Sequence, residues 1–160
     1  MATGSKLTHL DSEGRARMVD VGDKPHSERT ARAEARLLAS SETLDLVRTG
    51  QAKKGDVITV AEIAGVMGGK KTADLIPLCH PLPLSKINVK ITLEEDALRV
   101  VTETRTTGQT GVEMEALTAA GIAALTLYDM LKAVDKSMTI TGLRLLEKTG
   151  GVSGDYKRDE

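Results

Sequence analysis

An aspartate and a lysine, Asp129 and Lys132, stand three residues apart just after a long apolar stretch of the 160-residue sequence. Residues three apart are neighbours on one face of a helix, where the pair could give protons to a bound molecule and take them back. The same spacing is that of an ordinary exposed ion pair, which contributes only about 0.3 to 0.5 kcal/mol to stability. Spacing alone favours the ion pair. The preceding apolar residues favour a partly dry site, where burial would lower the pKa of Lys132.

His80 belongs to the segment Leu78-Cys79-His80, which is set among three prolines. Proline disfavours helix in itself and in the residue before it, so we expect an extended segment with Leu78 and His80 on one face and Cys79 on the other. A lone histidine is more often structural than catalytic, but the prolines would hold this imidazole at little entropic cost. Its spacing to Cys79 and to the other two histidines fits no metal-ligand pattern, so we expect no metal site.

Two glutamates, Glu113 and Glu115, stand where the long helix should begin. Carboxylates are favoured there by the helix dipole, which is reason enough for their presence. A fixed carboxylate can also accept paired hydrogen bonds from the N–H groups of a guanine ring. Both interpretations stay open on the sequence.

Several cations could instead contact phosphate. Residues 65–72 look at first like a phosphate-binding loop, but their glycine spacing fails the Walker A pattern, and they follow an expected helix rather than a strand. A solvated helix break containing Lys70, or a weaker contact of Lys70 with an anion, are the two alternatives. Arg29 and Lys54 are ordinarily solvated charges that could also bind phosphate.

The elements that must position these residues follow from hydrophobic periodicity. We expect a strand at residues 30–39, helices that begin after Ser40 and Asp56, a hairpin over 87–102, a long helix over 112–134 and a strand over 138–146. This order predicts an α+β fold with a ferredoxin-like β-α-β-β-α-β core and an extra N-terminal strand at 16–21. Residues 1–160 should form a single domain, with a flexible arm at 1–14 and a mobile glycine-rich tail at 149–160.

The amino-acid composition argues against several classes of protein. The net charge of -1 and the scarcity of aromatic residues argue against nucleic-acid binding, and a single cysteine excludes an internal disulfide or a Cys-rich zinc site. No apolar run reaches the roughly 20 residues of a membrane span, so we expect a cytoplasmic protein with no membrane partner. A core without Phe or Trp is thin for a monomer, which favours a homo-oligomer.

Several motifs, taken together, resemble the MoaC family of molybdenum-cofactor biosynthesis, and the likeness covers nearly the whole chain. They are Lys54-Gly55-Asp56-Val57, Asp74-Leu75-Ile76-Pro77-Leu78-Cys79-His80-Pro81, Thr110-Gly111-Val112-Glu113-Met114-Glu115-Ala116-Leu117-Thr118-Ala119-Ala120, Tyr128-Asp129-Met130 with Lys132, and Gly150-Gly151-Val152-Ser153-Gly154-Asp155.

The resemblance implies a hexamer built as a trimer of dimers, and a phosphorus–oxygen lyase that rearranges a cyclised GTP derivative to cyclic pyranopterin monophosphate with release of pyrophosphate. It also implies roles for individual residues. Asp129 and Lys132 would be catalytic and Lys54 and His80 would assist; substrate contacts would come from Leu78, Cys79, His80, Glu113, Met114 and Glu115, with Arg29 and Lys70 facing the phosphates. Whether Mg²⁺ accompanies those phosphates is left open.

One expectation comes from helix geometry and not from the resemblance. Glu115 and Asp129 are 14 residues apart, or about 21 Å along a straight helix. A compact pocket can hardly use both from one chain, so unless Gly121 kinks the helix we expect the site to lie between subunits. The rival hypothesis from another class is a non-catalytic oligomer that binds a nucleotide or a pterin through the same residues.

Overall fold

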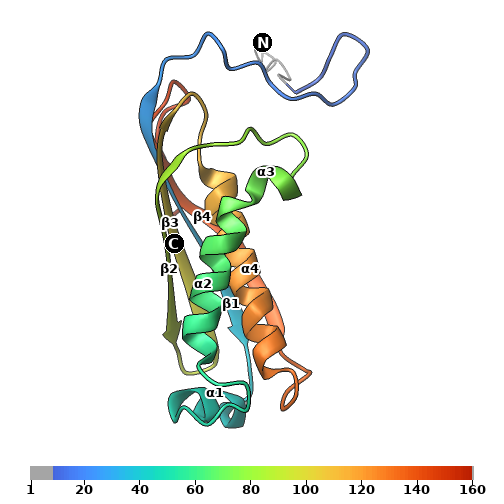
Figure 1. Ribbon diagram of the computed structural model, residues 1–160, viewed down its shortest axis with the longest axis vertical. Helices are drawn as coiled ribbons and strands as arrows, with labels where there is room; N and C mark the ends of the chain where they lie inside the picture. The colour runs from blue at the N-terminus through green and yellow to red at the C-terminus, as the bar shows by residue number, and fades with distance from the viewer. Residues whose placement is uncertain (1–8, 160) are drawn as a thin grey trace.

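The computed structural model describes residues 9–159 and forms two layers, a five-stranded antiparallel sheet with two long helices packed on one of its faces (Figure 1). The strand order is β2-β3-β1-β4-β5, which is the order of a split β-α-β-β-α-β core, so the predicted ferredoxin-like α+β class is confirmed. The elements are β1 Ser27–Leu38, α1 Ser41–Arg48, α2 Val57–Lys70, α3 Thr72–Leu75, β2 Leu84–Leu93, β3 Ala97–Gly108, α4 Glu113–Leu131, β4 Thr139–Thr149 and β5 Tyr156–Lys157.

Strand β1 lies at the centre of the sheet and carries small side chains toward the helices. Ala31, Ala33 and Ala35 are fully buried, whereas the residues between them point to the opposite, polar face. Alanine favours helix, but its period-two spacing between polar residues predicted a strand, and the prediction is confirmed. Because these side chains are short, α4 can pack closely over β1.

Both predicted helix caps form. The Ser40 hydroxyl accepts a hydrogen bond from the Thr43 N–H and begins α1, and the Asp56 carboxylate accepts one from the Thr59 N–H and begins α2. Gly50, with a φ of 69°, follows the end of α1 as expected. The hairpin of β2 and β3 also forms where the sequence predicted it.

The glycines of α2 are packing residues, and the predicted helix break lies just after them, at Lys71 between α2 and α3. Helix α2 continues through Gly68 and Gly69 to Lys70, and both glycines are buried. A Cβ at Gly68 would lie 2.6 Å from Ile122 Cγ1, and one at Gly69 would overlap Ile87 of β2. The two glycines therefore let α2 approach α4 and the sheet at a distance that no larger side chain permits.

Substitution of Gly68 by alanine is expected to destabilise the fold by about 1 to 3 kcal/mol, because the added methyl overlaps Ile122 in a packed interior. Gly121 of α4 is the matched control, since a Cβ there would meet only Leu143 at 3.7 Å, an ordinary contact. Alanine at that position should raise stability by about 0.5 to 1 kcal/mol through helix propensity. Urea denaturation of both variants measures the difference. Equal effects would show that close packing does not explain Gly68.

Helix α4 is the core helix of the domain. Eight of its residues, Glu115 and seven alanines and leucines, are buried. In the part of the chain that the structure describes, α4 alone is long and apolar enough to cross a membrane, and its packing against α2 and the sheet accounts for that composition. It is one helix from Glu113 to Leu131, slightly shorter than predicted and uninterrupted at Gly121.

The two ends of the chain differ from expectation. Residues 17–21 form no strand, and Ala16 makes only an isolated bridge with Leu10. The Gln109 side chain instead holds the following loop, donating to the carbonyls of Gly22 and Lys24. Of the arm predicted at residues 1–14, residues 1–8 lie outside the described residues. After Thr149 the chain turns and pairs with β4 as β5, a strand that the sequence did not predict.

Candidate active site

Helix α4 divides the predicted site residues into two groups, one at each of its ends. The C-terminal end carries Asp129 and Lys132, and the N-terminal end carries Glu113, Met114 and Glu115. Because α4 is uninterrupted over 19 residues, the two groups are separated by about 20 Å within one chain. The four residues predicted to be catalytic are therefore not all together.

Asp129 lies between two lysines at the C-terminal end. Its Oδ1 is 2.9 Å from Lys132 Nζ and its Oδ2 is 3.4 Å from Lys54 Nζ. Lys54 also donates to the Asp129 carbonyl at 3.0 Å, which joins the loop before α2 to the last turn of α4. Two cations and one carboxylate thus share an open surface, with about half of each side chain exposed.

The charge state of Lys132 differs from the one expected on the assumption that this lysine is buried. The hydrogen bond that Lys132 donates to Asp129 raises the pKa of Lys132, so the predicted lowering of that pKa is wrong. The reason is that 51% of the Lys132 side chain is exposed, so no burial opposes its charge. Hydrogen bonds from Lys132 and Lys54 lower the pKa of Asp129. Near neutral pH, Lys132 is therefore protonated, and in that state it can donate a proton but cannot accept one.

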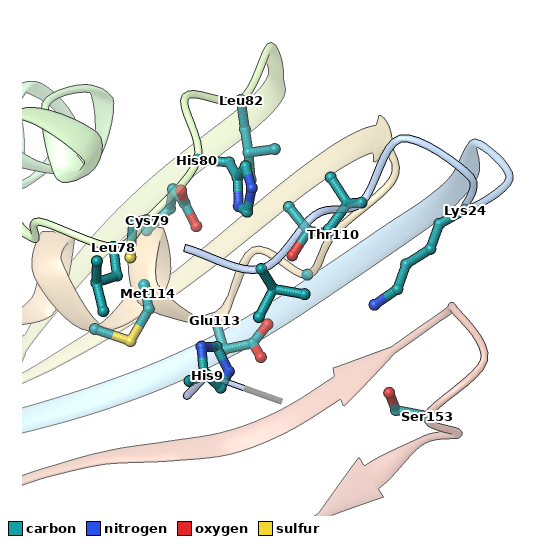
Figure 2. A pocket seen from close by; sticks show the side chains of 14 residues that line it. His9, Lys24, Leu78, Cys79, His80, Leu82, Thr110, Glu113, Met114 and Ser153 are labelled. Carbon is teal, nitrogen blue, oxygen red and sulfur yellow. The ribbon is translucent and has the colours of Figure 1, made fainter. Parts of the chain in front are cut away.

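A cavity of about 410 Å³ opens at the N-terminal end of α4 (Figure 2). Figure 2 shows side chains from the start of α4, from the segment after α3 and from the N-terminal segment around the same space. Its lining includes His9, Leu78, Cys79, His80, Leu82, Thr110, Glu113, Met114, Glu115 and Ser153. The structure thus brings six of the predicted substrate-contacting residues together in one cavity.

The segment from Leu78 to His80 reaches this cavity through a turn. The Cys79 N–H donates to the Ile76 carbonyl at 3.1 Å, which closes a tight turn just after α3. The turn breaks the alternation of an extended chain, so Cys79 lines the same cavity as its two neighbours. The prediction that Cys79 faces away from them is wrong for this reason.

The two glutamates at the start of α4 differ in environment. Glu113 accepts a hydrogen bond from Lys148 Nζ at 3.3 Å through Oε1, whereas its buried Oε2 has no partner among residues 9–159. That oxygen lies against Gly111, where any Cβ would overlap it. Glu115 is only 4% exposed and lies in the wall of the cavity. A buried carboxylate oxygen without a partner is suited to accept from a ligand N–H group.

Burial raises the pKa of Glu115 to about 7, with the nearby Glu113 charge adding to the effect. Burial also raises the pKa of Cys79, and both glutamates contribute to that shift. Near neutral pH, Glu115 is therefore poised to hold or release a proton, whereas Cys79 remains a thiol.

Glu115 should make stability depend on pH. Its pKa is about 7 in the folded protein against an ordinary value of 4.5, so the folded state binds this proton more tightly. Its contribution is fully present below about pH 4.5 and is lost as pH rises through about 7, a change of about 3 kcal/mol. Urea denaturation at pH 5 and pH 8 should show this loss in the wild type but not in Glu115→Gln. Glu42→Gln, on the exposed face of α1, is the control. An unchanged pH slope in Glu115→Gln would contradict the assignment.

A smaller cavity of about 100 Å³ adjoins the first and is lined by cations. Lys24, Arg29 and Lys148 surround it, and Glu113 borders both cavities. Arg29 is 8% exposed and donates through Nε to the Gly108 carbonyl at 3.1 Å. Sequence reasoning found Arg29 but missed Lys24 and Lys148. No local motif marks those two lysines, because they come from a loop and from the end of β4.

Lys70 lies at the exposed C-terminal end of α2 and lines neither cavity. Its neighbour Gly69 packs against the backbone of Glu115, so Lys70 belongs to the same end of the molecule as the cavities. Within residues 9–159, no three His, Cys, Asp or Glu side chains lie close enough to hold a metal ion.

Known proteins resemble this sequence over most of its length. The sequence model of the MoaC family matches residues 18–151, which include both ends of α4 and, apart from His9 and Ser153, the residues that line the two cavities. The chain belongs to the MoaC family. Three relatives, each called cyclic pyranopterin monophosphate synthase, match it along almost its whole length. The protein of Thermomicrobium roseum is 56% identical, covering 98% of this chain and 95% of the relative.

The relative from Methylobacterium sp. strain 4-46 is 57% identical over 97% of this chain and 98% of its own length. That of Peptoclostridium acidaminophilum is 50% identical over 96% of this chain and 98% of its own length. The MoaC-family resemblance seen in the motifs is therefore confirmed, and it extends over the scaffold as well as the site.

Proposed function

We propose that the protein is a cyclic pyranopterin monophosphate synthase. It would convert (8S)-3',8-cyclo-7,8-dihydroguanosine 5'-triphosphate to cyclic pyranopterin monophosphate and pyrophosphate in molybdenum-cofactor biosynthesis. The observation that carries the proposal is 50–57% identity, over nearly the whole chain, to relatives of that name. The cavities support it, because a space bordered by carboxylates adjoins one lined by cations, as a guanine-derived triphosphate requires.

The base and phosphate ends of the substrate would occupy adjoining cavities. The unpartnered Oε2 of Glu113 and the buried carboxyl of Glu115 would accept N–H groups of the base, beside Met114 and the Leu78 to His80 turn. Lys24, Arg29 and Lys148 would bind the phosphates, with Lys70 approaching from the end of α2. Any Mg²⁺ would arrive with these phosphates.

The reaction is a phosphorus–oxygen lyase step, in which a ribose-derived hydroxyl attacks the α-phosphorus and the bond to the β-phosphate oxygen breaks. Lysine charges near the leaving pyrophosphate would stabilise it. Opening and reclosing the base requires proton transfers, and we assign these transfers to Asp129, Lys132 and His80. Because Lys132 is charged near neutral pH, its role would be that of a proton donor or an electrostatic group.

We infer that the active site is shared between subunits of a homo-oligomer, a hexamer built as a trimer of dimers. The two ends of α4 are too far apart to meet over one substrate in one chain. An apolar stripe on the outer face of α2 supports packing on a second copy, since Val60, Ile63 and Met67 are 41%, 55% and 56% exposed. A two-fold contact there would bring the C-terminal end of one α4 toward the cavity of its partner.

The deciding experiment is incubation of the purified protein with the cyclised GTP substrate, with pyrophosphate release and pterin formation measured together. Both products should appear in equal amounts. The rival hypothesis, a cytoplasmic oligomer that only binds a nucleotide or pterin, predicts saturable substrate binding without pyrophosphate. That result from a folded oligomer would overturn the proposal.

A further inference from the structure

The buried face of β3 changes from aliphatic to hydroxyl-bearing side chains along the strand. Its inward-facing residues Leu98 and Val100 are aliphatic, and the next three positions in the same row are Thr102, Thr104 and Thr106. All five are fully buried. The change occurs where β3 passes beneath the start of α4, at the end of the molecule that holds the cavities.

Each buried threonine hydroxyl donates to a carbonyl of another segment. Thr102 Oγ1 is 2.8 Å from the Ala116 carbonyl, and Thr104 Oγ1 is 3.0 Å from the Val112 carbonyl. Thr106 Oγ1 is 2.7 Å from the Pro83 carbonyl. Longer contacts of 3.5 Å join the first two hydroxyls to carbonyls of β1. The three threonines therefore hold the backbone at Val112 and Ala116, at the start of α4, and at Pro83, just before β2.

These carbonyls flank the residues that line the larger cavity. Those of Val112 and Ala116 bracket Glu113 and Glu115 in the first turn of α4, and that of Pro83 follows the segment that carries His80. Packing alone does not explain the row, because valine fills nearly the same volume without burying a hydroxyl. A directional hydrogen bond fixes distance and register, which an aliphatic contact leaves adjustable.

We propose that Thr102, Thr104 and Thr106 are positioning residues, which fix the two walls of the substrate cavity at a set distance from the sheet. This inference rests on the proposed function for its kinetic consequence, but its structural consequence is independent of any activity. The threonines do not touch substrate. They act through Glu113 and Glu115 on one wall and through the segment after His80 on the other.

The test compares Thr104→Val with Thr104→Ser, which removes a methyl and keeps the hydroxyl. We expect the Val variant to raise KM for the cyclised GTP substrate about fivefold, the equivalent of one ordinary hydrogen bond, with kcat within about twofold of wild type. The Ser variant should retain the wild-type KM. Thr106→Val and Thr106→Ser repeat the comparison for the opposite wall. Thr107→Val is the control, because Thr107 belongs to the same strand and is exposed.

Amide hydrogen exchange gives a readout that does not require activity. In Thr104→Val the amides of residues 116–119, the first that donate within α4, should exchange about fivefold faster, whereas those of residues 127–131 should be unchanged. If Thr104→Val does not fold, Thr102→Val replaces it, since the Ala116 carbonyl lies inside α4 and keeps its helical partner.

The proposal is overturned if the Val variants keep wild-type exchange at residues 116–119, or if Val and Ser variants are equally impaired. An inactive wild-type protein would refute the proposed function alone, because the exchange comparison would still decide on the threonines.

Discussion

Replacement of Lys132 by alanine is expected to lower kcat for pyrophosphate release by about a thousandfold, as loss of a proton donor or of a charge on the reacting group does. Lys132 is half-exposed, so its replacement should leave the fold intact. Steady-state kinetics with circular dichroism as a folding check measures the effect. Lys136→Ala is the matched control, because Lys136 is exposed in the loop four residues further on, and it should retain nearly full activity.

Asp129→Asn tests whether the protonation state of Lys132, and not only the presence of its side chain, controls the rate. The hydrogen bond and charge of Asp129 raise the pKa of Lys132, so removing the carboxylate should lower that pKa and move the alkaline limb of the pH–rate profile to lower pH. A variant with reduced kcat and an unmoved alkaline limb would contradict the role of Lys132 as the titrating proton donor. A fully active Lys132→Ala variant would remove Lys132 from the mechanism.

Mixed oligomers of Glu115→Ala and Lys132→Ala chains are expected to recover about a quarter of wild-type activity. In a mixed dimer, one of the two shared sites receives an intact Glu115 from one chain and an intact Lys132 from the other, while the second site receives neither. Random pairing of equal amounts makes half of the dimers mixed, which gives this fraction. Assay of the unfractionated mixture measures this recovery, and mixed dimers purified through two affinity tags should reach about half of wild-type activity, because one of their two sites is intact.

The control for this experiment mixes Asp129→Ala with Lys132→Ala. Both changes lie in the same group at the C-terminal end of α4, so no pairing restores an intact group and no activity should return. Recovery with Glu115→Ala and none in the control would establish a site between subunits. If a purified mixed species of Glu115→Ala and Lys132→Ala is inactive, each site must be built within one chain.

The sequence by itself determined the order of the core elements from β1 to β4. Period-two alanines predicted β1 against their helix propensity, and Ser40 and Asp56 marked the starts of α1 and α2, because capping and hydrophobic periodicity are local properties. The sequence also predicted that Glu115 and Asp129 lie far apart on one helix, because the rise per residue of a helix is fixed by its backbone hydrogen bonds.

The tertiary structure alone decided the environment of each side chain. It placed Lys132 in solvent, which reversed the expected direction of its pKa shift, and it buried Glu115. It packed Gly68 against Ile122 of α4, and it brought Lys24 and Lys148 beside Arg29 from distant parts of the chain. Burial, charge and close approach depend on neighbours far apart in sequence, and no local pattern specifies which segments will meet.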